Sequence, residues 1–420
     1  MIGLSHLKWI KKQKATQKIK VNEIKISNLV KWRYDKKKIF HSSNKFFRII
    51  GVDIKTNFFT KNWDQPIIKQ NEIGILGIIK DKIKNKYLLQ AKLEPGNINK
   101  LQLSPTVQAT KSNYSKVHGG KNIAFLDFFL KKQKYKILQS EQGFRYYKKF
   151  NANIIYTTGE KINYNKNFRW LSINEIKYLL NKKNLINMDT LSVFSSFIKK
   201  KNNDFSKNNF KSIIKWMNIN DKRYFLNSKI KDLSNLKDWN ISDYRISNLK
   251  NLFFSVIGIN VNTNLREVKS WSQPIIKGKT LALTGFLIKD FNRTKHYLCR
   301  YILKPGSIKG SITCTANTSD LINYRKDDYL SLFQKKIIKN CFLNKKNFFL
   351  YNNILSDEGG RFYHTQIKYI AVKLNSNDNI EIPKTYMWIS QNQMIDLIKK
   401  KKIDIEARLL FGIINIKDTI

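Results

Sequence analysis

Residues 271–278 read WSQPIIKG, and a near copy, WDQPIIKQ, stands at residues 63–70. Gln-Pro favours an extended backbone before the proline, and the Ile-Ile pair that follows is typical of the start of a strand. Each tryptophan offers a large flat surface with one hydrogen-bond donor. We interpret Trp63 and Trp271 as anchors of the fold at the entry to a strand, with ligand contact as the alternative for Trp63. So specific an octapeptide, written twice about half a chain apart, indicates an internal duplication.

Further paired features follow in the same order in both halves. The runs KFFRIIGVDI (45–54), KYLLQAKLEPGN (86–97), QSEQGFRYY (139–147) and FRWLSINEIKYLL (168–180) correspond to LFFSVIGINV (252–261), HYLCRYILKPGS (296–307), LSDEGGRFY (355–363) and YMWISQNQMIDLI (386–398). The short β-branched and aromatic runs predict strands. Apolar residues at helical spacing after Ser172 and Ser390 predict a capped helix at the end of each repeat.

The chain has 420 residues, of which 42% are hydrophobic and 13% aromatic, so it can bury a substantial core. With roughly 100–200 residues per domain as the usual size, the duplication favours two α+β domains. We expect a first repeat over 1–200, which holds the main catalytic half, a polar linker over 201–238, and a degenerate second repeat over 239–420. Within the linker, WMNINDKRYFL (216–226) is expected to form a short helix.

The formal net charge of +49 would ordinarily indicate a nucleic-acid partner. Lysine is scattered through every segment, however, and accompanies an excess of isoleucine and asparagine, as an AT-rich coding sequence would produce. We therefore expect no nucleic-acid partner, and general attraction to anionic ligands is the alternative.

Three cysteines, Cys299, Cys314 and Cys341, show no CxxC spacing, which favours reduced thiols over a zinc site or a disulfide framework. The N-terminal MIGLSHLKWIKKQK lacks the apolar core of a signal peptide, and no apolar run approaches the roughly 20 residues that span a bilayer. We expect a soluble cytoplasmic protein with no membrane partner.

Several long strings carry a family resemblance. WDQPIIKQNEIGILG, QAKLEPGN, LQLSPTVQATKSNY, VHGG, LQSEQGFRYY and NMDT resemble the first half of the NDP-hexose 2,3-dehydratase family, and WSQPII, SDEGGRFYH, WIS and EARLL resemble its second half. The resemblance implies a tandem of two Nudix-like domains, each a mixed sheet flanked by helices, in a homodimer. It also implies the substrate dTDP-4-keto-6-deoxyglucose, which loses its C2 hydroxyl and C3 proton to give an enol and then a 3,4-diketo-2,6-dideoxy sugar nucleotide. Neither a metal nor an organic cofactor is expected.

A Nudix hydrolase would need a helical row of acidic residues to hold Mg²⁺, and the sequence has no REx₂EExG string. The resemblance therefore implies the fold without pyrophosphate cleavage. Asp357 and Glu358 are paired acids, but they stand before Gly359-Gly360 in a segment typical of a turn.

The implied reaction needs a base near C3, an acid for the departing C2 hydroxyl, and a donor for the C4 oxygen. Glu94 precedes a Pro-Gly turn, where the second half has Lys304, and His118 lies in VHGG, which has no counterpart. We expect the working site mainly in the first repeat, with Glu94, His118 or Tyr147 as the acid and base. The alternatives are that Glu94 stabilises its turn and that His118 is a solvated loop residue.

Binding candidates come from both halves. Trp32 and Trp239 each precede a strand in a polar context, so stacking on thymine and core packing are equal alternatives. Arg145 and Arg361 correspond to each other and either bind diphosphate or hold a structural carboxylate. Glu141 corresponds to Asp357, which favours a structural acid over a catalytic one. The remaining candidates are Gln90, Thr106, Gln108, Thr110, Lys111, Ser112, Asn113, Tyr114, Ser140, Gly359 and Gly360.

The second half reads TCTANTSD where the first has PTVQATKSNY, so we expect the motif, and any ligand role of residues 313–318, to be lost there. Together with Leu191, which follows NMDT where family members often carry arginine, this leaves a second interpretation open. That interpretation is a non-catalytic, Nudix-like protein that binds a nucleotide sugar. The retained Glu94, His118 and PTVQATKSNY favour the enzyme.

Overall fold

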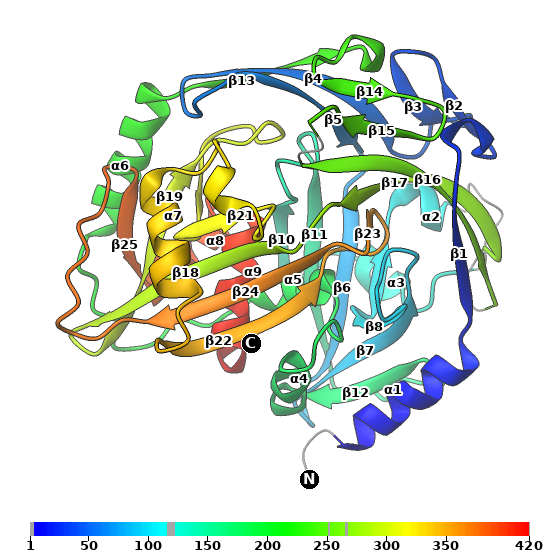
Figure 1. Ribbon diagram of the computed structural model, residues 1–420. Helices are drawn as coiled ribbons and strands as arrows, with labels where there is room; N and C mark the ends of the chain where they lie inside the picture. The colour runs from blue at the N-terminus through cyan, green and yellow to red at the C-terminus, as the bar shows by residue number, and fades with distance from the viewer. Residues whose placement is uncertain (1–3, 116–121, 251–252, 265–267, 420) are drawn as a thin grey trace.

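The computed structural model describes residues 4–115, 122–250, 253–264 and 268–419, and the chain consists of two repeats with a similar order of elements (Figure 1). The first repeat contains β2 (Trp32–Tyr34), β3 (Lys38–His41), β4 (Arg48–Thr56), β5 (Trp63–Lys69), β6 (Gly74–Asp81), β7 (Lys86–Leu93), β8 (Leu101–Ser104), β9 (Val107–Ala109), α2 (Lys111–Tyr114), α3 (Asp127–Leu130), β10 (Tyr135–Ser140), β11 (Phe150–Thr158), β12 (Phe168–Ser172), α4 (Ile173–Leu180) and α5 (Met188–Ser196). The strands predicted from KFFRIIGVDI and KYLLQAKLEPGN are confirmed as β4 and β7.

The second repeat contains β14 (Trp239–Ile241), β15 (Arg245–Asn248), β16 (Phe254–Thr263), β17 (Ser270–Gly278), β18 (Ala282–Phe291), β19 (Thr294–Ile302), β20 (Ser311–Thr313), β21 (Ala316–Thr318), α7 (Leu332–Ile337), β22 (Phe348–Ser356), β23 (Phe362–Tyr363), β24 (Gln366–Lys373), β25 (Tyr386–Ser390), α8 (Gln391–Lys399) and α9 (Ile405–Ile414). The expected duplicated α+β architecture is confirmed.

Each repeat is built around a large mixed sheet. The strand order is β10-β11-β6-β7-β12 in the first, with β8 beside β7 and β9 beside β6, and β22-β24-β18-β19-β25 in the second, with β20 beside β19 and β21 beside β18. In both sheets one central pair, β11 with β6 and β24 with β18, is parallel. The two sheets therefore share one topology, as duplication requires.

The helices after β12 and β25 are confirmed, and both begin with a capping box. The hydroxyls of Ser172 and Ser390 accept bonds from the third helical residues, Glu175 and Gln393, whose side chains reach back to the serine amides. A further helix, α5 or α9, follows in each repeat, so the capped helix is not the last element. α5 packs against α9, and together they carry the hydrophobic core from one repeat into the other.

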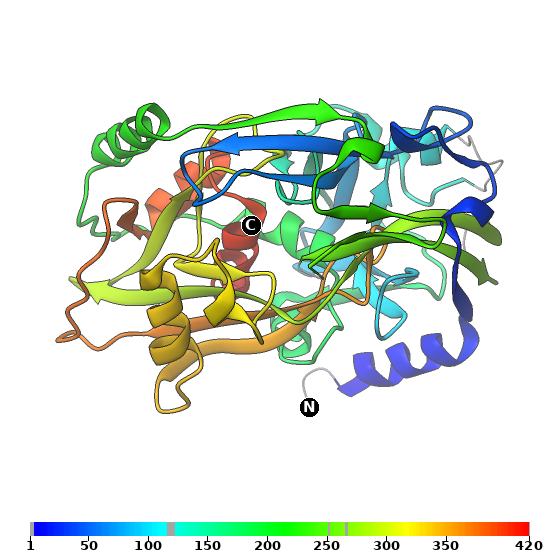
Figure 2. The same cartoon turned by 45° about the horizontal axis from the view of Figure 1, so that its top comes forward.

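The two repeats exchange a strand. β1 (Ile19–Ile24), which follows helix α1 (Leu4–Thr16), pairs antiparallel with β16 of the second repeat. β13 (Leu226–Lys231) precedes the second repeat but pairs antiparallel with β4 of the first. Figures 1 and 2 show β1 running from α1 along one side of the molecule, beside β16. Each small sheet, one around β2 to β5 and one around β14 to β17, is thus completed by a strand from the other half.

The segment expected to be a linker, 201–238, contains regular structure. Helix α6 (Phe210–Arg223) is longer than the predicted short helix, because Asn209 caps it by accepting a bond from the amide of Ser212. The exchanged strand β13 follows it directly.

The repeated octapeptide lies in β5 and β17, which begin at Trp63 and at Ser270, earlier than the expected start at Ile-Ile. Pro66 lies inside β5, opposite Gly51 of β4, and an edge strand tolerates a proline because no ladder bond needs its missing amide. The indole nitrogen of Trp63 donates to Gln65, whose amide donates to the carbonyl of Phe144 at 2.7 Å. Trp271 and Gln273 repeat this arrangement on the carbonyl of Gly360. The octapeptide therefore holds the turn that follows β10 or β22 in its own repeat.

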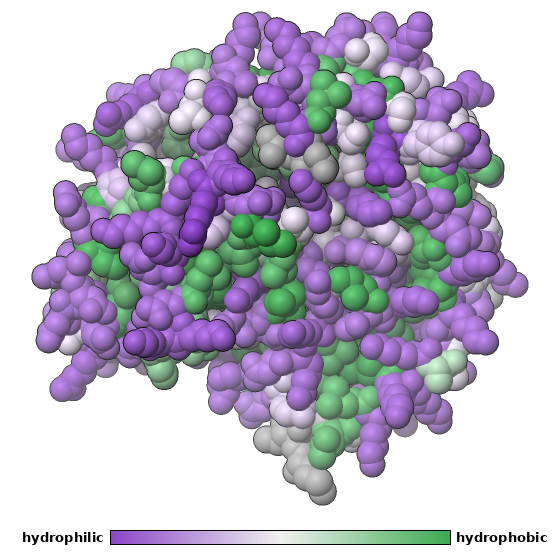
Figure 3. All heavy atoms as spheres, in the orientation of Figure 1, coloured by the Kyte–Doolittle hydropathy of each residue, from purple (hydrophilic) through white to green (hydrophobic). Residues whose placement is uncertain are grey.

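Hydrophilic side chains cover most of the face in Figure 3, with smaller hydrophobic patches between them, in keeping with the scattered lysines of the sequence. Within the described part of the chain, no helix is both long and apolar enough to cross a membrane.

Candidate active site

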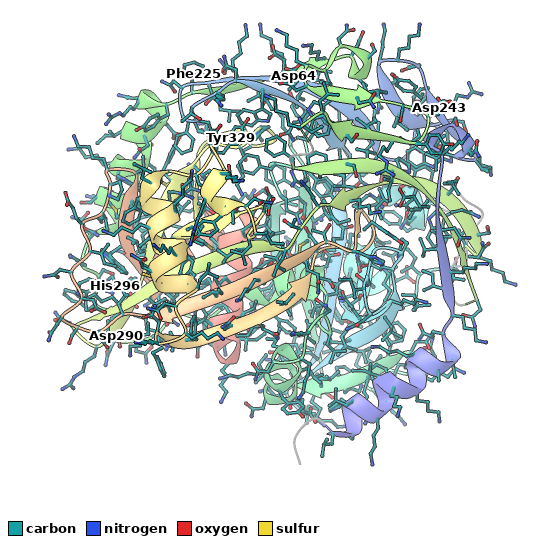
Figure 4. The ribbon with its side chains drawn as sticks, in the orientation of Figure 1. Asp64, Phe225, Asp243, Asp290, His296 and Tyr329 are labelled. Atoms are coloured by element: carbon teal, nitrogen blue, oxygen red, sulfur yellow. The ribbon has the colours of Figure 1, made fainter. Side chains whose placement is uncertain are left out.

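Two pockets occupy corresponding places in the repeats, and each is lined by residues from both halves. The lining of the first pocket includes Trp32, Phe46, Phe47, Lys92, Glu94, Gln108, Thr110, Asn113, Tyr146, Lys149, Asp189, Trp271, Ser272, Gln273, Glu358, Gly360 and Arg361. The lining of the second includes Trp63, Gln65, Gln142, Phe144, Arg145, Phe253, Arg300, Asn317, Tyr329, Asp357, Phe362 and Glu406. Figure 4 labels Tyr329 of the second pocket and Asp64, which lies beside Trp63 on β5.

The turns that follow β7 and β19 bring the repeats together. The amide of Gly96 donates to the carbonyl of Gly359 at 2.7 Å, and the amide of Gly306 donates to Gly143 at the same distance. A Cβ atom on Gly96 would lie 1.8 Å from the carbonyl oxygen of Phe362, so this approach requires glycine. The Glu94-Pro-Gly turn is therefore fixed against the SDEGGRF turn of the second repeat.

Glu94 lies at the end of β7 with its carboxylate in the first pocket, 2% exposed. Oε1 accepts from Gln108 at 3.0 Å, and Oε2 accepts from Asn187 at 3.4 Å. The ammonium of Lys92 lies 3.7 Å from Oε1. A buried carboxylate held by two amides and one cation is well oriented for proton transfer.

A second carboxylate reaches the first pocket from the other repeat. The hydroxyl of Tyr146, which is buried, donates to Oε2 of Glu358 at 2.6 Å. Burial raises the pKa of Glu358, and the charge of Glu94 adds to the rise while Arg361 opposes it. Burial also raises the pKa of Tyr146 well above its ordinary value.

Asp189 and Lys149 complete the charged lining. Burial raises the pKa of Asp189 well above its ordinary value, and the nearby charges of Glu358, Glu141 and Glu94 add to this effect. Burial lowers the pKa of Lys149 to about 8, and its ammonium donates to the carbonyl of Glu72. Strongly shifted groups gathered in one pocket are typical of a catalytic site.

A buried arginine of the second repeat interacts with Asp189 of this pocket and with Glu141. Arg408 of α9 is fully buried and donates to the hydroxyl of Ser192 at 2.7 Å and to the carbonyl of Ser140 at 3.0 Å. Burial lowers its pKa to about 10. Burial and the charge of Glu358 raise the pKa of Glu141 to about 7, whereas Arg408 opposes that rise. Arg408 thus acts as a counter-charge from the second repeat for acids of the first.

The lining of the first pocket also combines a cation with aromatic rings. The guanidinium of Arg361 lies 4.1 Å from the ring centre of Phe47 and donates to the carbonyl of Gly360. The indole nitrogen of Trp32 donates to the carbonyl of Ser272 at 2.8 Å, and its ring lies 4.9 Å from that of Phe47. Aromatic rings of this kind can stack on a nucleobase, and the guanidinium can bind an anionic group.

The second pocket differs in its charged groups. Lys304, at the position of Glu94, is buried and pairs with Asp404 at 2.8 Å and with Glu406 at 2.6 Å. Gln142 stands at the position of Glu358 and donates to Asp357 at 2.7 Å. Phe362 stands at the position of Tyr146, so the hydroxyl is absent there. Arg145 stacks on Phe254 as Arg361 stacks on Phe47. The second pocket keeps the arginine and the octapeptide but not the paired carboxylates.

The predicted site residues divide between the pockets. Those that line the first pocket are Trp32, Glu94, Gln108, Thr110, Asn113, Gly360 and Arg361, and those that line the second are Trp63 and Arg145. Outside both linings lie Gln90, Thr106, Lys111, Ser112, Tyr114, Ser140, Glu141, Tyr147, Trp239 and Gly359. His118 lies outside the described residues.

Several of these placements have a simple cause. Trp239 is buried, and its indole nitrogen donates to the carbonyl of Asp64, so it packs in the core rather than offering a platform to a base. Ser112 is buried and bonds to Glu72. Tyr147 lies beside Lys69 and Lys148, and its neighbour Tyr146 faces the first pocket instead.

The remaining placements are also structural. Gln90 lies inside β7, between Phe168 of β12 and Ser104 of β8. Lys111 is exposed at the start of α2, and Tyr114 packs on the core at its end. The carbonyl of Ser140 and the carboxylate of Glu141 are bonded to Arg408 and Asn151. Gly359 is buried against Asn97 and Glu94.

The expected loss of PTVQ from the second half needs correction. Thr106 is buried, and its hydroxyl donates to the carbonyl of Leu88 and accepts from the amide of Ile79. Thr315 makes the same two bonds with Leu298 and Leu287. Asn317 occupies the strand position of Gln108 and lines the second pocket. The threonine therefore belongs to the fold of both repeats, and only the amide side chain faces a pocket.

Replacement of Thr106 by valine is expected to lower the free energy of unfolding by about 1–3 kcal/mol, because it leaves a buried carbonyl and a buried amide without a partner. Thr315→Val should cause a similar loss, although it lies in the other repeat. Chemical denaturation of both variants checks this, and Thr106→Val should keep the substrate KM of the native protein. A raised KM without a loss of stability would instead indicate that Thr106 contacts a ligand.

Five ionisable residues in the lining of the first pocket were not among the candidates: Lys92, Tyr146, Lys149, Asp189 and Glu358. Asp189 lies in NMDT and Glu358 in SDEGGRFYH, two strings that carry the family resemblance, so closer attention to their acids could have found them. No feature of the sequence indicates that the SDEGGRF turn of the second repeat reaches the first pocket.

Among the residues described by the structure, no group of three or more His, Cys, Asp or Glu side chains is placed to hold a metal ion.

Two α+β repeats that share a carboxylate-lined pocket define a duplicated protein with a site suited to proton transfer on an anionic ligand. The NDP-hexose 2,3-dehydratase family profile matches residues 5–197 and 210–414. The chain therefore belongs to the NDP-hexose 2,3-dehydratase family, and the expectation of a carbon–oxygen lyase is confirmed.

Similar curated proteins carry the name dTDP-4-dehydro-6-deoxy-alpha-D-glucopyranose 2,3-dehydratase. The one from Saccharopolyspora spinosa is 29% identical over 96% of this chain and 89% of its own length. The one from Amycolatopsis orientalis is 28% identical over 97% and 89%, and the one from Streptomyces violaceoruber 29% identical over 96% and 95%. Among solved structures, a C. elegans Ap4A hydrolase matches with a TM-score of 0.20 and 15% identity over 29% of this chain and 86% of its own. An ADP compounds hydrolase matches with a TM-score of 0.21 and 11% identity over 35% and 75%.

Proposed function

We propose that the protein removes water from dTDP-4-keto-6-deoxyglucose in the first pocket. The C2 hydroxyl and the C3 proton leave, and the resulting enol becomes a 3,4-diketo-2,6-dideoxy sugar nucleotide. The names of the three relatives support this substrate. The observation that carries the choice of pocket is the buried carboxylate of Glu94, whose position in the second pocket is taken by the ion-paired Lys304.

The C4 carbonyl makes the C3 proton acidic, so one well-placed carboxylate is sufficient as the base. We assign this role to Glu94, because amide donors hold both of its oxygens in place. Arg361 and Lys149 are available for the diphosphate, and Trp32 with Phe47 for the thymine. The role proposed for His118 stays a prediction.

The direct test is incubation of the purified protein with dTDP-4-keto-6-deoxyglucose. We expect mass spectrometry to show loss of one water, with the unstable diketone trapped by a diamine. Binding of the nucleotide sugar by folded protein without any loss of water would instead favour a non-catalytic, Nudix-like binding protein.

Replacement of Trp32 by leucine is expected to raise the substrate KM about tenfold and to change kcat little, because the thymine loses the ring on which it stacks. Steady-state kinetics with the full substrate checks this. A KM equal to that of the native protein would show that Trp32 serves the fold alone, through its bond to Ser272.

For the remaining organisation we propose two Nudix-like domains, over 1–200 and 239–420, joined by 201–238, in a homodimer. We propose neither a nucleic-acid partner nor a membrane partner. The second pocket, which keeps Arg145 and Trp63, is proposed to serve as scaffold or as a nucleotide-binding pocket without chemistry. Light scattering of the purified protein tests the dimer.

A further inference from the structure

The second repeat contributes a carboxylate to the first pocket through a rigidly held turn. Glu358 lies between β22 and β23, where Gly96 donates to Gly359 at 2.7 Å and Gln273 donates to Gly360 at 2.8 Å. One bond comes from the first repeat and one from the second, so the two residues that follow Glu358 are held against both repeats.

Tyr146 orients this carboxylate. Its hydroxyl donates to Oε2 of Glu358 at 2.6 Å, and its ring packs edge-on against Phe362 at 5.9 Å. A Cβ position built on Gly360 lies 3.2 Å from Oε1 of Glu358 and 3.8 Å from Oε1 of Glu94. Two carboxylate oxygens from different repeats thus face one small region of the first pocket.

The carboxylates of Glu94 and Glu358 have different surroundings. Glu94 accepts bonds from two amides and lies near the ammonium of Lys92, so both of its carboxylate oxygens are held in place. Burial, with the charge of Glu94, raises the pKa of Glu358 and so favours its protonated form. One group is thus suited to take a proton and the other to give one.

The second pocket provides an internal comparison. At the positions of Glu94, Tyr146 and Glu358 it has Lys304, Phe362 and Gln142. Its arginine and its octapeptide residues remain in place. The two carboxylates and the tyrosine hydroxyl therefore differ between the pockets as a set, which indicates that they act together.

We propose that Glu358, supplied by the second repeat and positioned by Tyr146, is the acid that protonates the departing C2 hydroxyl. The inference rests on the proposed dehydration. Glu94 takes the C3 proton as the C3–H bond breaks, and the electron pair forms an enolate with the C4 carbonyl. As the enolate collapses, the C2–C3 double bond forms while the C2–O bond breaks, and the departing hydroxide takes the proton of Glu358 and leaves as water.

The same pair completes the reaction. The product of elimination is an enol at C3, and Glu94, now protonated, returns its proton to C2. The enol hydroxyl loses its proton to the Glu358 carboxylate as the C3 ketone forms. Both side chains regain their starting states, and the net change is the loss of one water.

Glu358→Gln separates the two proton transfers. In D₂O with dTDP-4-keto-6-deoxyglucose, we expect this variant to exchange the C3 proton for deuterium while its release of water falls about 100-fold. Exchange is followed by NMR and water release by mass spectrometry. Gln142 shows that glutamine is accommodated at the corresponding position of this fold, and a circular dichroism melt checks folding.

Tyr146→Phe is the positioning variant, since Phe362 shows that phenylalanine packs at the corresponding place. We expect it to lower kcat about tenfold without a change in KM, and to keep C3 exchange. Glu160→Gln is the matched control, because Glu160 is exposed and belongs to neither lining, and it should behave as the native protein does.

The outcomes separate the inference from the proposed function. If the native protein releases no water from this substrate, the proposed function fails and the inference with it. If the native protein is active and Glu358→Gln releases water at a near-native rate, only the inference is overturned. Loss of both C3 exchange and water release in a folded Glu358→Gln protein would also overturn the inference. Such a result would mean that Glu358 is needed for removal of the C3 proton.

Discussion

Replacement of Glu94 by glutamine is expected to abolish both exchange of the substrate's C3 proton and release of water. The variant keeps the size of the side chain and can still accept from Gln108, so the turn should persist. It lacks the basic oxygen, and removal of a general base of this kind costs about 1,000-fold in rate. Deuterium incorporation and water release in D₂O measure both quantities in one sample.

This result would distinguish Glu94 from Glu358, whose variant should retain exchange. Glu160→Gln again serves as the control for the chemical change at an exposed site. Full activity in folded Glu94→Gln would show that its carboxylate merely stabilises the Pro-Gly turn, and His118 would then become the leading candidate for the base.

Replacement of Arg408 by leucine is expected to lower the free energy of unfolding by about 3–5 kcal/mol at pH 8, because it removes the counter-charge of buried acids. Leucine already stands at the corresponding position of the first repeat, Leu191, so its shape is accommodated in this helix. The bonds to Ser192 and Ser140 are also lost. Denaturant unfolding at several pH values measures the effect.

The pH dependence follows from Glu141. Burial raises its pKa to about 7 in the folded protein, from an ordinary value of 4.5. Between these values the folded state binds more protons than the unfolded state, so stability falls as pH rises. Loss of Arg408 should raise this pKa further and extend the fall above pH 7. The deficit of Arg408→Leu should therefore be larger at pH 8 than at pH 5.

A second variant tests the cause. In Arg408→Leu combined with Glu141→Gln, the buried charge is removed together with its partner, and the extra loss at pH 8 should disappear. An equal deficit at both pH values in the single variant would mean that packing and hydrogen bonds, rather than charge, account for the effect of Arg408.

The elements that could be predicted from the sequence are those with local causes. The serines that begin α4 and α8 carry their own capping partners three residues on, and the strands β4, β6 and β7 stand out by composition. The duplication was visible because long strings recur in order. The start of β5 was placed too late, since the edge position that tolerates Pro66 depends on its neighbour β4.

The candidate site was less accessible to prediction, because it depends on contacts between distant segments. QSEQGFRYY holds two adjacent tyrosines, and the pairing of Tyr146 with Ile68 decides which faces the first pocket. The octapeptide was interpreted as structural, yet Trp271 and Gln273 of its second copy line the first pocket. Thr106 gave the opposite result. It belongs to PTVQATKSNY, which carries the family resemblance, yet its side chain stabilises the fold.

The exchange of β1 and β13 has a consequence for synthesis of the protein on the ribosome. The first repeat needs β13, which ends at Lys231, and β1 needs β16, which ends at Thr263. A nascent chain of two hundred residues therefore contains a complete large sheet but an open strand edge at β4. Cotranslational folding must keep that edge from other partners until more than half of the chain has emerged, which makes the early nascent chain the stage most exposed to aggregation.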